Sequence, residues 1–169
     1  MQAKDIMHPE DAKALQILKK LRGFDDLIRV VMENGYEKQY RGDNLGNYLK
    51  VNDSNYKHIY QLFKGVVKQV GIKMPELYIY NDPEMNAYTY GETNTFIAIS
   101  SSLIVRLSID ELRSVMAHEC GHILCQHTLY NTLLRTIEEL GILLQIISYS
   151  ALGPILMAMQ YWSRKSELS

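Results

Sequence analysis

The chain has 169 residues, of which 47% are hydrophobic, and its formal net charge is −1. This length is enough for a domain with a real core, and the balanced charge argues against a nucleic-acid partner. No positively charged start followed by an apolar run is present, so no secretory signal is indicated. Cys120 and Cys125 lie on one predicted helix, point in different directions and cannot readily bridge, which favours a cytoplasmic location and small buried thiols.

Residues 1–74 are expected to form an N-terminal helical segment that packs on the core. Apolar residues recur there at the helical period in three stretches, and a polar region separates the second from the third. In chain order we expect a helix over 9–23, a helix over 24–34, a short strand at 48–51 and a helix over 56–70 that Gly71 closes. A proline that opens a helix and a glycine that follows one are typical of such boundaries.

Short strands are predicted between this segment and the next helix. One covers residues 77–80, and two more, at 87–90 and 95–99, flank a turn at 91–94 and form a hairpin. Two roles for the hairpin stay open. Its edge could bind an extended peptide through main-chain hydrogen bonds, or it could simply cover one side of the core.

A long helix is predicted over residues 108–135. Ser108 followed by Glu111 is the capping-box pattern that begins a helix, and Leu112, Val115 and Met116 begin an apolar stripe.

This helix carries the strongest motif of the chain, His118-Glu119-Cys120-Gly121-His122. At about 100° per residue, His118 and His122 lie on the same side one turn apart, so both imidazoles can bind one metal ion. Glu119 is placed beside that ion without being a ligand, which is the geometry of the H-E-x-x-H motif of zinc hydrolases. The alternative is a pair of core histidines that are hydrogen-bonded to the backbone, with Glu119 paired elsewhere.

A catalytic zinc site needs a third protein ligand and one open position. His127 is expected on the opposite side of the helix from His118, where it would cap or brace a neighbouring segment. Glu138 and Glu139 lie too far along the helix axis to turn back. Glu167 follows a hydrophobic excursion that can return the chain to the motif helix, and it is the best candidate.

That excursion, residues 140–162, contains no charged residue. Gly153-Pro154 is expected to break it into two pieces, each too short to span a bilayer. Two interpretations remain open. The stretch forms two buried or partly exposed helices, or it mediates membrane association through 140–162.

Several motifs together resemble family forty-eight of the metallopeptidases, the HtpX-like and CAAX prenyl protease group. The similarity runs roughly from residue 77 to the end. It is carried by Asn86-Ala87-Tyr88, the hairpin, the small-residue turn at 100–103, Asp110-Glu111-Leu112, the H-E-x-x-H motif and His127. In that family a later helix carries a glutamate ligand in the pattern E-x-x-A-D, often after Ser-Arg. Ser163-Arg164 and Glu167-Leu168-Ser169 match as far as they go, so the resemblance implies that Glu167 is the third ligand.

The elements and the resemblance together predict an α+β fold. It would be a mainly helical, zincin-like peptidase domain of gluzincin type, with a small antiparallel sheet or hairpin before the H-E-x-x-H helix. The implied activity is that of a zinc-dependent metalloendopeptidase acting on protein or peptide substrates. One Zn²⁺ per chain would be held by His118, His122 and Glu167, with Glu119 as general base. The alternative function is a non-catalytic, chaperone-like or peptide-binding module with an incomplete zinc site.

In the family pattern Ala-Asp would follow Glu167-Leu168-Ser169, and Ser169 is the last residue. Support of the metal site by such an aspartate is worth roughly ten- to a hundredfold in affinity or activity. We therefore expect residues 75–169 to be a zinc peptidase core cut off at its C-terminal end. This truncated piece would bind zinc weakly or not at all and be inactive, whereas the intact protein would be an active protease.

Overall fold

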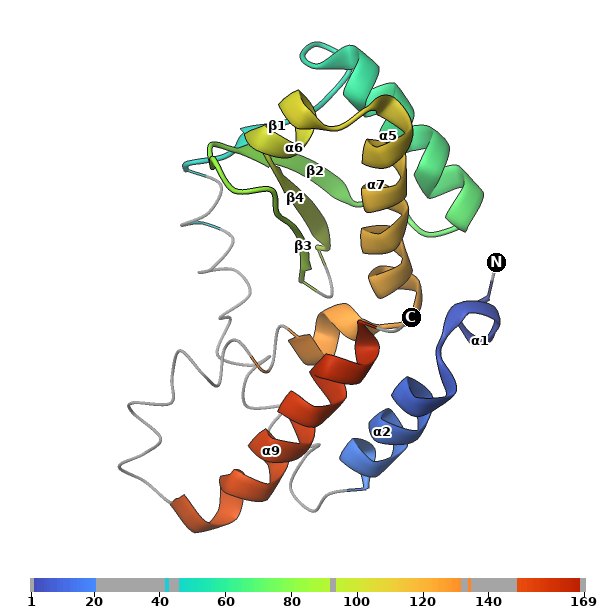
Figure 1. Ribbon diagram of the computed structural model, residues 1–169, viewed down its shortest axis with the longest axis vertical. Coiled ribbons are helices and arrows are strands. Elements are labelled where there is room, and N and C mark those ends of the chain that lie inside the picture. Colours follow the sequence, from blue (N-terminus) through green and yellow to red (C-terminus); the bar gives the residue numbers. More distant parts are fainter. Residues whose placement is uncertain are drawn as a thin grey trace.

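A computed structural model describes residues 2–20, 42, 46–91, 94–131, 134 and 149–167 (Figure 1). In chain order its helices and strands are α1 (Ala3–Ile6), α2 (Pro9–Lys19), β1 (Leu49–Lys50), α5 (Lys57–Val70), β2 (Glu76–Tyr80), β3 (Ala87–Tyr90), β4 (Phe96–Ser100), α6 (Ser101–Arg106), α7 (Ile109–Leu124) and α9 (Tyr149–Ser166). The α+β class is confirmed. The predicted helix over 24–34 lies outside the described residues.

The strands form one sheet in the order β1-β2-β4-β3. The predicted hairpin is confirmed, because β3 and β4 pair antiparallel, with Tyr90 opposite Phe96. The sheet as a whole is mixed, because β2 runs parallel to β4. This differs from the antiparallel sheet that the sequence suggested. The reason is that β3, which follows β2 in the chain, takes the edge position. The strand β4 then lies between β2 and β3 and pairs with both.

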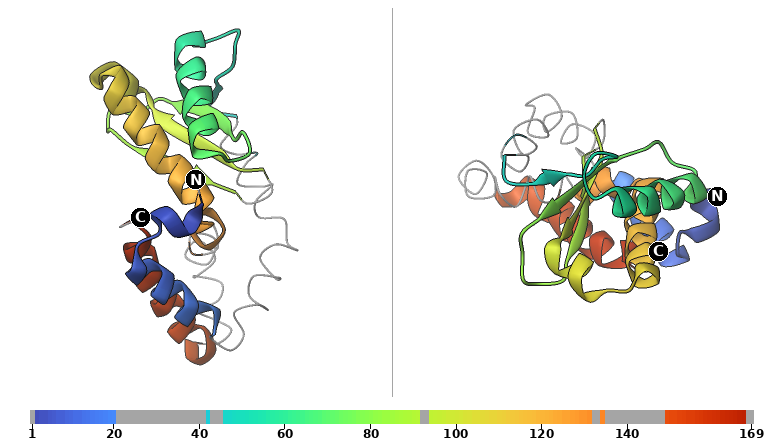
Figure 2. Two further views of the ribbon diagram at one scale, coloured as in Figure 1. Left: turned by 90° about the vertical axis from the view of Figure 1, so that its right-hand side faces the viewer. Right: turned by 90° about the horizontal axis from the view of Figure 1, so that it is seen from above.

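The main core lies between one face of the sheet, α5 and α7 (Figures 1 and 2). Alternate residues of β2 and β4, such as Leu77 and Ile97, point into it, and α5 contributes Phe63 while α7 contributes Met116. Full burial of one such side chain is worth about 1.5–3 kcal/mol. The apolar stripe of α7 is therefore held firmly against the sheet, and this fixes the direction of the residues on its other sides.

A second hydrophobic cluster joins the two ends of the chain. In it α2 packs along α9, and the two helices lie side by side near the C-terminal end of α7 (Figure 2). Leu15 and Leu18 of α2 meet Met159 and Trp162 of α9, and Trp162 is fully buried. The helix α9 is thereby set against α2, and its end is brought to the motif helix α7.

The predicted break at Gly153-Pro154 is wrong, since α9 continues through both residues. A proline inside a helix costs about 3 kcal/mol. The burial of Ile155, Met159 and Trp162 against α2 offsets this cost, because each such side chain contributes about 1.5–3 kcal/mol. Residues 140–148 lie outside the described part. Among the helices that are described, none is long and apolar enough to cross a membrane.

Candidate metal centre

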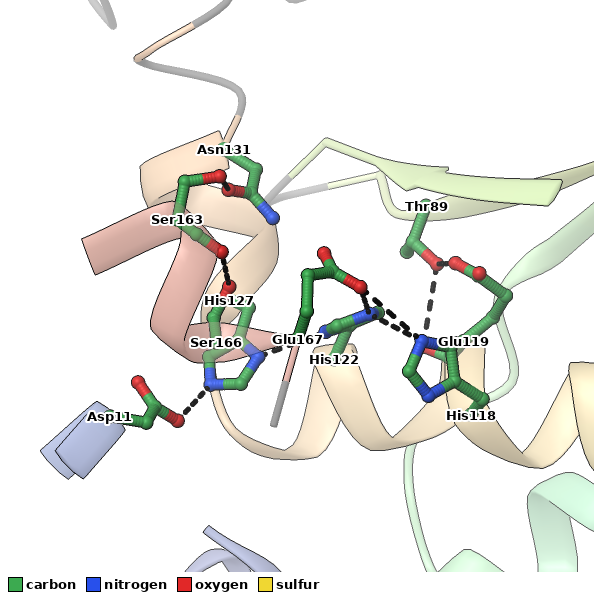
Figure 3. Close-up of polar contacts among 10 residues, drawn as sticks. All are labelled: Asp11, Thr89, His118, Glu119, His122, His127, Asn131, Ser163, Ser166 and Glu167. Carbon is green, nitrogen blue, oxygen red and sulfur yellow. Dashed lines mark hydrogen bonds and ion pairs between the residues drawn. The ribbon is translucent and has the colours of Figure 1, made fainter. Parts of the chain in front are cut away.

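The helix α7 carries the three residues of the motif. Its start is the predicted capping box: Ser108 Oγ accepts a hydrogen bond from the Glu111 main-chain N–H at 3.4 Å, and Glu111 Oε2 accepts one from the Ser108 main-chain N–H at 2.8 Å. With the apolar stripe buried against the sheet, His118, Glu119 and His122 face the end of α9 and strand β3 (Figure 3). One donor atom from each of these three residues lies within 4.8 Å of the others.

Glu167, just beyond α9, lies beside the two histidines. His118 Nε2 and His122 Nε2 are 3.1 Å apart, and Glu167 Oε2 lies 3.6 Å from the first and 3.7 Å from the second. In a tetrahedral zinc site with bonds of 2.0–2.2 Å, neighbouring ligand atoms are about 3.3–3.5 Å apart. The three atoms therefore have the spacing that a single zinc-sized ion requires.

Glu119 points to strand β3 instead. Its side chain is buried, and Thr89 Oγ1 donates a hydrogen bond to Glu119 Oε2 at 2.6 Å while lying 3.3 Å from the Glu119 main-chain oxygen (Figure 3). The Thr89 hydroxyl thus fixes the direction of a carboxylate that stands next to the two imidazoles. Such a carboxylate can exchange a proton with a water molecule near the histidines.

The predicted continuous helix over 108–135 is interrupted. The helix α7 ends at Leu124, Gln126 adopts a left-handed conformation with φ 61°, and a new helical segment begins at His127. This break overrides the helical period, so His127 is not on the far side of the helix from His118. It lies fully buried against His122, with the two Nδ1 atoms 2.9 Å apart. The prediction that His127 braces a neighbouring segment is confirmed.

The segment that His127 braces is the N-terminal helix α2. His127 Nε2 lies 2.8 Å from Asp11 Oδ2, and the indole N–H of Trp162 donates to Asp11 Oδ1 at 3.0 Å. A line of buried polar groups therefore runs from α2 through His127 to His122 (Figure 3).

Burial and nearby charge shift the pKa values of the three histidines in different directions. The Glu167 carboxylate raises the pKa of the partly exposed His118, and His118 in turn holds the pKa of Glu167 below its usual range. Burial lowers the pKa of His122 to about 4 and also lowers that of His127. At neutral pH the His122 imidazole is therefore uncharged, which is the form that can bind a metal ion.

The structure brings together the four predicted site residues, His118, Glu119, His122 and Glu167. Asp11 and Thr89 were not predicted from the sequence. Asp11 is in the first turn of a helix, where acidic residues are common because they interact favourably with the helix dipole. Thr89 is in a strand, where threonine is common. Neither residue therefore stood out as a functional residue in the sequence.

Cys120 and Cys125 are buried free thiols, as predicted. Burial raises the pKa of Cys120 to about 12 and that of Cys125 to about 11, so both stay protonated and are poor metal ligands.

An H-E-x-x-H helix beside a small sheet, with a glutamate returned to it by a later helix, defines a metallopeptidase domain. The chain belongs to Peptidase family M48, whose family model matches residues 53–169. This confirms the resemblance found in the sequence. Members of this family depend on a metal ion, and the histidine and glutamate group described above is where this chain offers donors for one.

Individual relatives agree with this assignment. The chain is 28% identical over 134 residues to the plastoglobule-localized metallopeptidase 48 of Arabidopsis thaliana, an alignment that covers 78% of this chain and 39% of the relative. It is 40% identical over 73 residues to the protease HtpX of Shewanella baltica (42% of this chain, 25% of the relative). With HtpX of Shewanella halifaxensis the identity is 47% over 58 residues (33% of this chain, 20% of the relative). The chain thus spans less than half the length of these relatives.

Proposed function

We propose that this chain carries the catalytic centre of a zinc-dependent metalloendopeptidase that hydrolyses peptide bonds in proteins. One zinc ion would be held by His118, His122 and Glu167, and Glu119 would act as general base. The observation that supports this most strongly is the spacing of the three donor atoms, whose separations are 3.1, 3.6 and 3.7 Å. Membership of a metallopeptidase family supports the same reaction class.

The donor set and its exposure also favour a catalytic site over a structural one. Two imidazole nitrogens and one carboxylate oxygen are a ligand set of catalytic zinc sites, which keep a fourth position open. The side chains of His118 and Glu167 are 44% and 59% exposed, so the space beside them is accessible to water and substrate. His122 and Glu119 form the buried side of the site.

The chain's own residues would move the proton. When bound, zinc supplies Lewis acidity, which makes water more acidic and a peptide carbonyl more electrophilic. Glu119 would take the proton from the attacking water and deliver it to the leaving amine, so it acts first as base and then as acid. Thr89 would keep the carboxylate aimed during both transfers.

Strand β3 offers a way to align a peptide substrate. It is one of the two edge strands in the described part of the sheet, and it is the one that packs beside α7. An extended peptide that lies along β3 would therefore pass next to Glu119. Main-chain hydrogen bonds to a strand depend little on peptide sequence, so this geometry suits hydrolysis of many protein segments.

Paired substitutions in the full natural chain test these roles. Glu119→Gln should lower peptide hydrolysis by about 100- to 10,000-fold, the usual contribution of a general acid–base group. Zinc content, measured by elemental analysis, should stay near one ion per chain in this variant. His118→Ala should lose both zinc and activity. Matched controls are Glu84→Gln and His58→Ala, since both residues are exposed and lie outside the site.

Two results would contradict the assignment. Equal loss of zinc in Glu119→Gln and His118→Ala would remove the distinction between base and ligand. Failure of the zinc-loaded full chain to hydrolyse any protein or peptide would favour the alternative, a chaperone-like or peptide-binding module that uses the sheet.

A further inference from the structure

Asp11 is a fully buried carboxylate that lies outside the part of the chain matched to the family, residues 53–169. It comes from α2, close to the N-terminus, and it contacts Trp162 from α9 and His127 from the segment after α7. A buried carboxylate is costly unless hydrogen bonds compensate it, so its position calls for a reason beyond packing. Figure 3 shows that the line of contacts through Asp11 leads to His122.

The hydrogen bonds along this line can run in only one direction. An ionised carboxylate only accepts and an indole N–H only donates, so Trp162 Nε1–H donates to one oxygen of Asp11 and His127 Nε2–H donates to the other. A neutral imidazole has one N–H, so His127 Nδ1 must be the acceptor. It lies 2.9 Å from His122 Nδ1, which therefore carries the hydrogen.

This direction leaves His122 Nε2 without a hydrogen. That is the atom 3.1 Å from His118 Nε2 and 3.7 Å from Glu167 Oε2, at the centre of the proposed metal site. The opposite tautomer would place a hydrogen on the ligand atom, and moving that hydrogen would weaken metal binding. Asp11 thus fixes the useful tautomer of His122 across one intervening imidazole.

We propose that Asp11 is a positioning residue of the metal site, which acts through His127 to hold His122 with Nε2 ready to bind the ion. The proposal rests on the ligand set of the proposed function. It makes the N-terminal helix α2 a part of the site, although the family match begins only at residue 53. Hydrogen-bond partners of metal-binding histidines contribute roughly ten- to a hundredfold to metal affinity.

Asp11→Asn is the sharpest test because it preserves the shape and reverses one hydrogen bond. The indole N–H of Trp162 can only donate, so the new amide side chain would orient its oxygen to accept that hydrogen bond. Its NH₂ group would then face His127 Nε2 and donate to it. His127 must then carry its hydrogen on Nδ1, facing His122 Nδ1, and His122 is driven to the tautomer with a hydrogen on Nε2. We expect zinc affinity, measured by chelator competition on the full chain, to fall by about 10- to 100-fold.

Trp162→Phe should rescue this loss. Without the indole N–H, the new amide can turn its oxygen to His127 and restore the original direction. Asp11→Asn should therefore cost much less zinc affinity in the Trp162→Phe background than in the natural chain. Glu10→Gln is the matched control: Glu10 precedes Asp11 on α2 and pairs with Lys165 of α9 at the surface, so it tests the docking of the two helices alone. It should leave zinc affinity unchanged.

The tautomers themselves provide a readout that needs neither metal nor activity. Two-bond ¹H–¹⁵N correlation spectra of the metal-free natural chain should show His122 with hydrogen on Nδ1 and His127 with hydrogen on Nε2. Asp11→Asn should exchange both.

The outcomes separate this proposal from the proposed function. Opposite tautomers in the natural chain, or equal losses from Asp11→Asn in both backgrounds, would overturn the positioning role. If the natural chain shows the expected tautomers and binds no zinc, the proposed function fails by itself.

Discussion

The carboxylate of Glu167 lies 3.6 Å from the Nε2 atom of His118, although α9 and α7 are separate in the chain. The contact exists because α9 is packed along α2 at the end of α7, which carries Glu167 back to the motif. In the metal-free protein these two groups form an ion pair, and each shifts the pKa of the other.

The titration of His118 should reveal this pairing. Its pKa is raised above the ordinary value of 6.5. The pair therefore stabilises the fold fully below pH 6.5, and this stabilisation is lost as the pH rises through the raised pKa of His118. The pKa of Glu167 is lowered from 4.5, so the contribution is also lost as the pH falls through that lowered value. Glu167→Gln should move the pKa of His118 down toward 6.5, as measured from histidine proton shifts in metal-free protein. Glu84→Gln should leave it in place; an unchanged titration in Glu167→Gln would refute the pairing.

Thr89→Val should separate catalysis from metal binding. The substitution keeps the shape of the side chain and removes the hydroxyl that donates to Glu119 Oε2 at 2.6 Å. A hydrogen bond to a charged group is worth about 1.5–3 kcal/mol, so kcat for peptide hydrolysis should fall by about 10- to 100-fold. Zinc content should not change, because Thr89 contacts neither histidine in the described set of hydrogen bonds.

Thr95→Val is the control for this experiment. Thr95 belongs to the same hairpin, just before β4, and its hydroxyl donates a hydrogen bond to the Gly91 main-chain oxygen at 3.3 Å. It should leave kcat near that of the natural chain. A similar loss of activity in both variants would mean that the hairpin, and not the Glu119 contact, is being disturbed.

Local sequence patterns predicted the elements that local forces determine. The capping box at Ser108, the helical period of α5 and the glycine that closes it at Gly71 all act within a few residues, and each appears as expected. The motif histidines were placed correctly relative to each other because they share one turn of α7.

Features that depend on contacts between distant segments could not be read in this way. Pro154 was expected to end a helix, but packing against α2 sustains α9 through it. Asp11 became part of the site only because α2 and α9 enclose it together with His127. The direction of His127 depends on the helix break at Gln126. No glycine or proline is present at that position to indicate a break.

That break leads to a prediction about stability. Gln126 has φ 61°, a left-handed conformation that costs an ordinary residue about 1–2 kcal/mol and costs glycine little. Gln126→Gly should therefore raise the free energy of unfolding by about 1 kcal/mol, measured by urea denaturation of the metal-free chain. Gln69→Gly, at an exposed position inside α5, should lower it by about 0.5–1 kcal/mol, since glycine is unfavourable within a helix. If both substitutions lower stability equally, the turn at Gln126 does not hold the left-handed conformation, and His127 would not be directed toward His122 by it.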